Sequence, residues 1–131
     1  MRSDTGAVTV AAGSPFLDRT RWVNENDSAV AIRDLFPVSR GHTLVVPKRV
    51  VSSLFDLSEQ EVLDCWRLLK EERQRLESEF SPDGFNIGMN VGEAAGQTVP
   101  HAHIHLIPRY AGDVPSPRGG VRGVIPGKAS Y

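Results

Sequence analysis

The chain contains the stretch His101-Ala102-His103-Ile104-His105-Leu106-Ile107-Pro108. Histidine and apolar residues alternate along it, and in a strand residues i, i+2 and i+4 point to the same side. His101, His103 and His105 are therefore expected to line one face, roughly 6–7 Å apart, which is twice the rise per residue of a strand. The apolar residues between them are expected to point the other way, beneath a helix. The stretch predicts a strand with one core face and one face that carries a row of imidazoles.

Four further segments are predicted to be strands. Residues 20–24 and 29–33 are separated by Glu25-Asn26-Asp27-Ser28, whose turn-forming residues indicate a hairpin. Residues 43–47 form a β-branched apolar run that a proline closes. Residues 85–91 alternate, so that two sets of side chains are expected on opposite faces. The two sets are Phe85, Ile87, Met89 and Val91, and Asn86, Gly88 and Asn90.

One long helix is predicted from about residue 59 to residue 79. Ser58 and Glu61 form a capping box at its start. Apolar residues then recur at helical spacing, with Arg73 interrupting one turn. The stripe consists of Val62, Cys65, Trp66, Leu69, Leu76 and Phe80. The order of the elements predicts an α+β domain, in which an antiparallel sheet carries one long helix across a face.

Composition fits one globular domain. The chain has 131 residues, a formal net charge of −1 and 40% hydrophobic residues. Near-neutral charge argues against nucleic acid as a partner, and no apolar run reaches the ~18 residues of a membrane span. We expect a cytoplasmic protein with a disordered lead-in over residues 1–14, a domain over 15–110 and an irregular basic tail over 111–131. The single cysteine, Cys65, excludes an internal disulfide and any multi-cysteine zinc site.

The histidine row has three interpretations. It can be without function, or it can bind a metal, because imidazole is a common ligand of zinc and iron. The nearest acids, Glu93 and Asp113, lie in loops. The third interpretation is nucleophilic catalysis at phosphorus by a neutral imidazole. The preceding loop favours the third, because Gly92 and Gly96 allow close backbone approach to a phosphate.

Residues 96–109 resemble the signature of the histidine triad (HIT) superfamily, in which three histidines alternate with apolar residues. The upstream segment 41–48 resembles the other recurrent stretch of that family, which carries a fourth histidine, here His42. The resemblance extends from about Trp22 to Arg109. It implies a homodimer built on a five-stranded antiparallel sheet with one long helix and a short one.

The resemblance implies a nucleotide hydrolase or nucleotidyl transferase. His103 matches the nucleophile, which attacks the α-phosphorus and forms a covalent nucleotidyl-histidine that water hydrolyses. His101 and His105 are expected to orient it and contact the phosphate, and His42 to extend the row. Gly96 belongs to the phosphate loop. The remaining binding positions are Gln97 and Thr98 for the phosphate and bridging oxygen, Asn90 for the phosphate site and Asp34 for the ribose, with Phe16 or Ile32 bordering the base.

Departures from the family pattern narrow the expected activity. Residues 15–18 lack the cysteines with which one branch holds a structural zinc, so we expect no metal on the protein, although Mg²⁺ can accompany a polyphosphate substrate. His105 replaces the glutamine of the uridylyltransferase-like branch, which favours hydrolysis and leaves phosphate open as an acceptor. Residues 93–99 and 108–113 look most like the fragile-histidine-triad branch, which cleaves diadenosine polyphosphates. A nucleoside phosphoramidase and a nucleotide-binding module with little turnover remain alternatives.

The last residues carry a local excess of positive charge. Residues 109–131 contain four basic side chains against Asp113 alone, whereas residues 1–108 contain 11 basic and 15 acidic ones. Such a tail is often only a solvated segment. We also consider that Arg118 and Arg122 reach a polyphosphate or a partner subunit's site.

Overall fold

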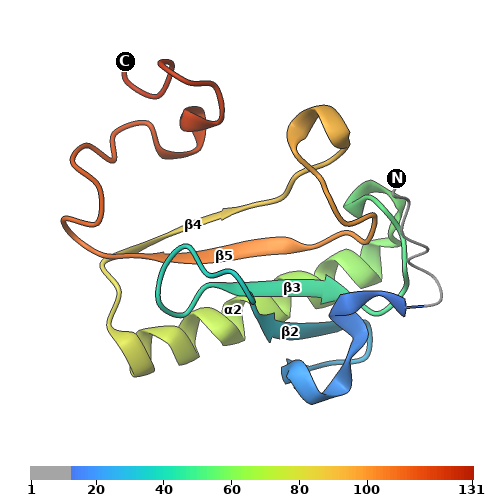
Figure 1. Ribbon diagram of the computed structural model, residues 1–131. Helices are drawn as coiled ribbons and strands as arrows, with labels where there is room; N and C mark the ends of the chain where they lie inside the picture. Colours follow the sequence, from blue (N-terminus) through green and yellow to red (C-terminus); the bar gives the residue numbers. More distant parts are fainter. Residues whose placement is uncertain (1–12) are drawn as a thin grey trace.

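Five strands form one antiparallel sheet in the computed structural model, which describes residues 13–131. The strand order is β1-β2-β3-β5-β4 (Figure 1). The strands are β1 (Trp22–Glu25), β2 (Ala29–Arg33), β3 (Thr43–Pro47), β4 (Gly84–Gly88) and β5 (Ile104–Arg109). The predicted α+β fold is confirmed, including the hairpin of β1 and β2.

The helix α2 (Glu59–Phe80) lies across one face of the sheet (Figure 1). The predicted capping box is present, since the Ser58 hydroxyl accepts the Glu61 N–H and the Glu61 carboxylate accepts the Ser58 N–H. Between residues 14 and 131 the other helical segments are short 3-10 turns rather than a second α-helix. They are η1 (Pro15–Leu17), η2 (Arg19–Arg21), η3 (Leu54–Asp56), η4 (Glu93–Ala95) and η5 (Gly120–Val124).

The strands contribute side chains to two separate hydrophobic cores, because successive side chains of a strand point to opposite faces of the sheet. Under α2, Ala29 and Ala31 of β2 and Val45 of β3 pack with the apolar face of the helix. On the opposite face, the intervening residues of the same strands pack with Phe16. That second core consists of Phe16, Val30, Ile32, Leu44 and Val46.

The buried stripe of α2 differs from the predicted one. Trp66 is 53% exposed, and Val62 is also exposed, whereas Leu68 and Glu72 are fully buried. The Glu72 carboxylate accepts hydrogen bonds of 2.8 Å from both Arg33 and Arg75, so the charge is paired inside the domain. The buried stripe of α2 is therefore rotated around the helix axis relative to the predicted one. Glu72, paired with two arginines, occupies the turn at which Arg73 interrupts the apolar spacing.

Two predicted strands are shorter than expected on the side of the connecting loop. β4 ends at Gly88, and β5 begins only at Ile104. His101 to His103 lie before β5, where the Ala102 N–H donates to the Val51 carbonyl at 2.7 Å and not to β4. Of the predicted apolar set on β4, only Phe85 packs against the core under α2. Ile87, Met89 and Val91 are 44%, 38% and 39% exposed.

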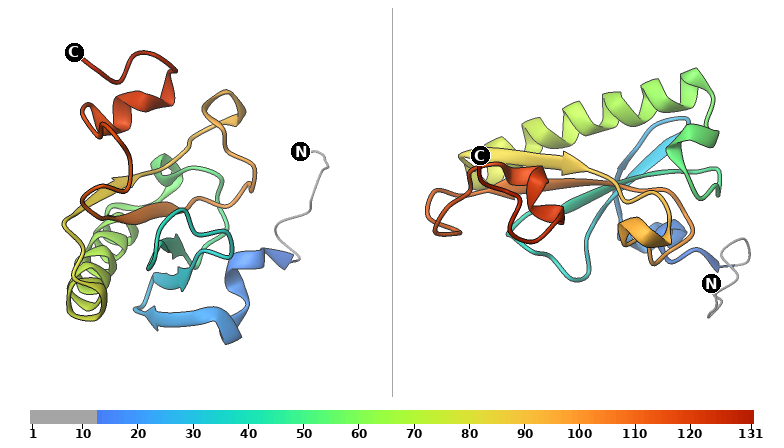
Figure 2. Two further views of the ribbon diagram at one scale, coloured as in Figure 1. Left: turned by 60° about the vertical axis from the view of Figure 1, so that its left-hand side comes forward. Right: turned by 90° about the horizontal axis from the view of Figure 1, so that it is seen from above.

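The first described turn, η1, and the turn η5 near the C-terminus lie on the side of the sheet away from α2 (Figure 2). Ser14 is buried there and Phe16 packs in the second core, while most of the expected lead-in, residues 1–12, lies outside the described residues. The segment after Asp113 is mostly irregular, and its turn η5 contacts β4.

No helix within residues 13–131 is both long enough and apolar enough to span a bilayer.

Candidate active site

A cavity of about 400 Å³ lies on the sheet face opposite α2, because Phe16 and Leu44 of the second core line it. It is formed by the segment before β1, the end of β2, the start of β3, the loop before β5 and the start of β5. Its wall brings together most of the residues predicted from the sequence. They are Asp34, His42, Asn90, Gly96, Thr98, His103 and His105. Phe16 also lines the cavity, whereas Ile32, the alternative neighbour of the base, is buried in the second core.

His101 is fully buried beside this cavity and holds its neighbours in place. Its Nε2 lies 2.8 Å from the Pro47 carbonyl oxygen, which can only accept, so Nε2 carries the proton. Its Nδ1 must then accept, and the Ser14 hydroxyl donates to it. Burial lowers the pKa of His101 below its usual value of 6.5, with the hydrogen bond to Pro47 opposing that shift. His101 is thus a neutral ring with both nitrogens engaged.

His103 is held with one nitrogen left for chemistry. Its Nδ1 lies 2.8 Å from the main-chain carbonyl oxygen of His101, so Nδ1 carries the proton and Nε2 carries a lone pair. The Phe16 ring packs against the imidazole, with 4.8 Å between ring centroids. His103 is half-buried and lines the cavity. The tautomer that a nucleophilic imidazole needs is therefore imposed by a backbone carbonyl.

His42 and His105 form a directed pair beside the nucleophile. The Val38 N–H donates to His42 Nδ1 at 3.2 Å, so in neutral His42 the proton is on Nε2. That Nε2 lies 2.9 Å from His105 Nδ1, which accepts, and His105 consequently keeps its proton on Nε2. The rings of His105 and His103 stand edge to face at 5.2 Å. The cavity therefore offers a lone pair on one ring and an N–H donor on the next.

Gly41 explains how His42 reaches this position. It has a φ of +91°, and a Cβ there would lie 2.9 Å from side-chain carbons of both Leu76 and Phe80. Only glycine allows the loop to pass this close to the end of α2. His42, the next residue, precedes β3 and is almost completely buried.

Asp34 stands at the edge of the pair. One carboxylate oxygen lies 3.4 Å from His42 Nε2, and the other accepts the Phe36 N–H at 2.9 Å. Burial is the largest influence on the two rings and lowers the pKa of both His42 and His105, and Asp34 opposes this only in part. Both rings are thus neutral near pH 7. The expected contact of Asp34 with a ribose remains a prediction.

The same three residues could also be considered as metal ligands. The ligand atoms of Asp34, His42 and His105 lie within 4.8 Å of one another. A histidine that binds a metal through Nε2 normally donates its Nδ1–H to an acceptor. His42 Nδ1 instead faces the Val38 N–H, a donor, so the metal-binding tautomer would place two protons against each other. The geometry favours a hydrogen-bonded relay over a metal centre.

The loop before β5 confirms one prediction and differs on another. Gly92 and Gly96 both adopt positive φ, at +91° and +94°, as the expected tight turn requires. Gln97, however, does not line the cavity. Its carboxamide accepts the Gly92 N–H and donates to the carbonyls of Ser52 and Val99. The N–H groups of Gly96 and Gln97 are also used within the loop, so that the loop presents the polar side chain of Thr98 to the cavity, next to the apolar Val99.

Sequence reasoning did not find Ser14. The signal for it is the Ser14-Pro15-Phe16 sequence, in which Ser14 caps η1 by accepting the Phe16 N–H. The two tail arginines, Arg118 and Arg122, stack on the ring of Tyr131 at 5.3 and 4.7 Å, and their contact with a polyphosphate or a partner subunit stays a prediction. Neither lines the cavity of the histidines.

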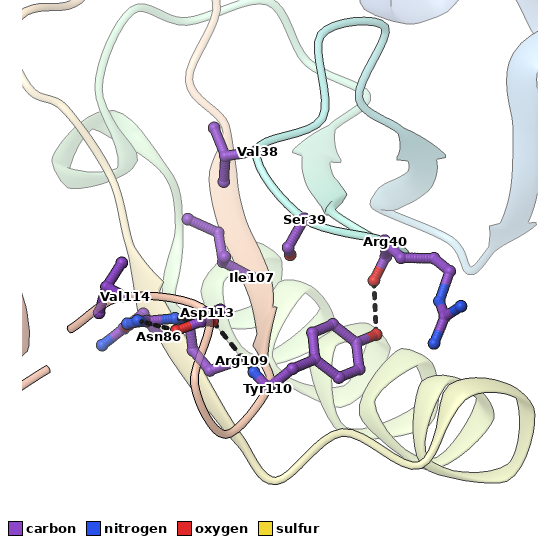
Figure 3. A pocket seen from close by; sticks show the side chains of 9 residues that line it. All are labelled: Val38, Ser39, Arg40, Asn86, Ile107, Arg109, Tyr110, Asp113 and Val114. Carbon is purple, nitrogen blue, oxygen red and sulfur yellow. Dashed lines mark hydrogen bonds and ion pairs between the residues drawn. The ribbon is translucent and has the colours of Figure 1, made fainter.

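A further cavity of about 540 Å³ lies near the other end of β5 (Figure 3). Several of its polar groups are already paired, and the Arg40 guanidinium stacks on the rings of Phe80 and Tyr110. Arg109 binds Asp113 through two hydrogen bonds of 2.8 Å and Asn86 at 2.6 Å, and the Tyr110 hydroxyl donates to the Arg40 carbonyl. The histidine cavity, with its open lone pair and N–H donor, is the candidate active site.

Comparison with known proteins points to one family. Residues 18–112 match the HIT domain family. The bis(5'-nucleosyl)-tetraphosphatase [asymmetrical] of Schizosaccharomyces pombe is 42% identical over 65% of this chain and 47% of its own length. The AP-4-A phosphorylase of Mycobacterium tuberculosis is 37% identical over 63% of this chain and 43% of its own. The chain thus spans about half the length of these curated relatives.

The fold has solved counterparts in the same family. The crystal structure of a HIT family protein from Bacillus anthracis superposes with a TM-score of 0.67 at 39% identity. The superposition covers 70% of this chain and 65% of that protein.

Proposed function

The chain belongs to the HIT domain family, and from this premise we propose that it cleaves dinucleoside polyphosphates at the α-phosphate through a covalent nucleotidyl-His103. The observation that carries the proposal is the protonation pattern of the cavity. His103 Nε2 holds a lone pair because Nδ1 donates to the His101 carbonyl, and the neighbouring His105 Nε2 holds a proton.

The first step forms one bond and breaks one. His103 Nε2 attacks the α-phosphorus, the new P–N bond forms, and the bond from phosphorus to the bridging oxygen breaks. The leaving nucleoside phosphate departs as an anion, stabilised by the N–H of His105, so it requires no complete proton transfer. The His101 carbonyl accepts the Nδ1–H of His103 and stabilises the positive charge that develops on that ring.

The second step regenerates the enzyme. With Nε2 bonded to phosphorus and Nδ1 protonated, the ring of His103 is cationic and a good leaving group. Water attacks the phosphorus, the P–N bond breaks, and His103 returns to its neutral form while one proton goes to solvent. The products are a nucleoside monophosphate and the nucleoside polyphosphate released first. We propose that Mg²⁺ enters with the polyphosphate and not as a protein-bound ion.

Phosphate is the second candidate for the acceptor. The relative from Mycobacterium tuberculosis is named as a phosphorylase, whereas the relative from Schizosaccharomyces pombe is named as a tetraphosphatase. Phosphate in place of water would release a nucleoside diphosphate from the same His103 intermediate.

We also propose that the chain forms a homodimer through β4. This strand is at the edge of the sheet, and Ile87, Met89 and Val91 on and after it are partly exposed apolar side chains. Exposed apolar residues along an open strand edge are a typical association surface. Sedimentation at equilibrium would test this, and a purely monomeric protein would contradict it.

One experiment tests the proposed reaction. The protein is incubated with diadenosine and diguanosine polyphosphates and with a nucleoside phosphoramidate, with and without phosphate, and the products are identified. The reaction is quenched early, and the peptide that carries His103 is examined by mass spectrometry for a nucleotidyl adduct. We expect the adduct with a dinucleoside polyphosphate and activity that survives chelation of protein-bound metal. Turnover of none of these substrates, with no adduct, would favour a binding module instead.

A further inference from the structure

A second cavity of about 520 Å³ adjoins the candidate active site. The two cavities share four wall residues, which are Val38, His42, Asn90 and His105. The pair of His42 and His105 therefore forms part of the boundary between the two cavities. His103 lines only the first cavity. A ligand that reacts at His103 can therefore extend past His105 into the second cavity.

The walls of this second cavity come from the sheet and from the C-terminal segment. Asn86 of β4 and Ile107 of β5 belong to the sheet face opposite α2, and Gly120 to Val124 form the turn η5 that lies above it (Figure 2). Val121 and Val124 are 63% and 75% exposed. Apolar side chains left open beside a reactive site are suited to cover a flat apolar group.

Charge indicates which part of a ligand fits there. Among the described residues that line the second cavity, none is an acid, a lysine or an arginine, and two are asparagines. A terminal phosphate would find no cation in it. A purine or other base would find apolar walls for its faces, and for its edge the Asn90 amide and the Nδ2 of Asn86, whose Oδ1 accepts from Arg109.

We propose that the second cavity binds the distal nucleoside of a dinucleoside polyphosphate, with η5 as its outer wall. This inference rests on the proposed function and names the part of the substrate that the leaving group carries. Both cavities have the volume typical of small-molecule sites, roughly 300–1,000 Å³. A substrate with a nucleoside at each end fills both, whereas a phosphoramidate with a small leaving group fills only the first.

The spacing along β5 agrees with this assignment. His105 and Ile107 are on the same face, about 7 Å apart along the strand, and Asn86 pairs with Ile107 in the sheet. If the phosphates bind at His105, the distal nucleoside therefore lies next to Ile107 and Asn86. The net positive charge of residues 109–131 adds a favourable potential for the polyphosphate.

Filling the second cavity from η5 tests the proposal. Gly123 lines it, has no left-handed φ, and a Cβ there would meet only the Ala129 side chain at 3.9 Å, so Gly123→Trp is compatible with the backbone. The matched control is Ile125→Trp, at an exposed residue of the same tail that does not line the cavity. Each variant is assayed with diadenosine tetraphosphate and with adenosine 5′-phosphoramidate, whose leaving group is ammonia and which fills only the first cavity.

Gly123→Trp should lower kcat/KM for diadenosine tetraphosphate by about tenfold or more, the size expected when a substrate group loses its binding pocket, and leave kcat/KM for the phosphoramidate unchanged. Ile125→Trp should alter neither. A change that is equal for both substrates, or no change for either, would overturn the inference while leaving the hydrolase function intact.

If the wild type cleaves neither substrate, the proposed hydrolase function fails. Nucleotide binding to the His103→Ala variant then still tests whether the second cavity binds a nucleoside. Calorimetry should then show tighter binding of diadenosine tetraphosphate than of ATP, and Gly123→Trp should remove that difference. Equal affinities for the two nucleotides would exclude a site for a second nucleoside.

Discussion

The two faces of the sheet are built from alternate residues of the same strands, yet they differ in how completely their polar groups are paired. On the α2 face, even the fully buried acid Glu72 accepts from two arginines and an asparagine. On the opposite face, two ring nitrogens of the histidine row remain open. Within residues 13–131, neither His103 Nε2 nor His105 Nε2 has a hydrogen-bond partner.

This difference separates the requirements of stability from those of chemistry. A closed face gains from burial and from complete hydrogen bonding. A reactive face must keep a lone pair and a donor free while everything around them is fixed, as Ser14, Pro47 and Val38 do for the imidazoles. Substitutions on the two faces should accordingly affect different measurements.

The largest effect is expected on the open face. His103→Ala removes the nucleophile and should lower kcat by at least about 10⁴-fold. Because His103 is only half-buried, its loss should change the free energy of unfolding by no more than about 1 kcal/mol. Steady-state kinetics and urea denaturation of the same preparation measure both. Near-normal turnover in this variant would remove His103 as the nucleophile.

A substitution under α2 should show the reverse pattern. Leu68 is fully buried, and Leu68→Ala should lower the free energy of unfolding by about 2–5 kcal/mol through lost burial and a new cavity. Its kcat should stay at the wild-type value wherever the protein remains folded. Leu63→Ala is the matched control, since Leu63 is on the same helix but 42% exposed, and it should cost less than about 1 kcal/mol. Equal losses from both variants would contradict the assignment of the core.

Local patterns in the sequence predicted much of both faces. The alternation in residues 101–108, the turn residues between β1 and β2 and the capping box at Ser58 all act over a few residues. They determine periodicity and chain reversal, which is why the pairing of β1 with β2 and the start of α2 could be foreseen.

Contacts between distant segments could not be foreseen in the same way. Ser14 meets His101 across 87 positions, and the Gln97 carboxamide is diverted to the Ser52 carbonyl across 45. Glu72 is acceptable inside the domain because Arg33, 39 positions away, points at it. A search for apolar spacing alone selects Trp66 for the core and passes over an acid whose partner lies on another element.

Ser14 provides a finer comparison between positioning and reaction. Ser14→Ala removes the donor to His101 Nδ1 and leaves a buried acceptor unpaired, which should cost about 1–3 kcal/mol of stability. Since the His101 carbonyl orients His103, kcat should also fall by about tenfold, with KM unchanged. Ser14→Thr keeps a hydroxyl and should restore most of the activity. If Ser14→Ala were destabilised but had a normal kcat, Ser14 would be structural only.

The smallest expected difference between the faces is in their response to pH. Burial lowers the folded-state pKa of His42, His101 and His105 below 6.5, so the unfolded chain binds more protons as the pH falls through that value. Stability from these rings is therefore complete above about pH 6.5 and declines below it. On the helix, Arg49 and the Ser58 N–H lower the pKa of Glu61 to about 2. The stability that ionised Glu61 contributes is therefore lost only below about pH 4.5. Urea denaturation between pH 8 and pH 5 should thus show a decline that His42→Gln reduces and Glu61→Gln does not; a flat profile for the wild type would mean that the three imidazoles titrate alike in the folded and unfolded chain.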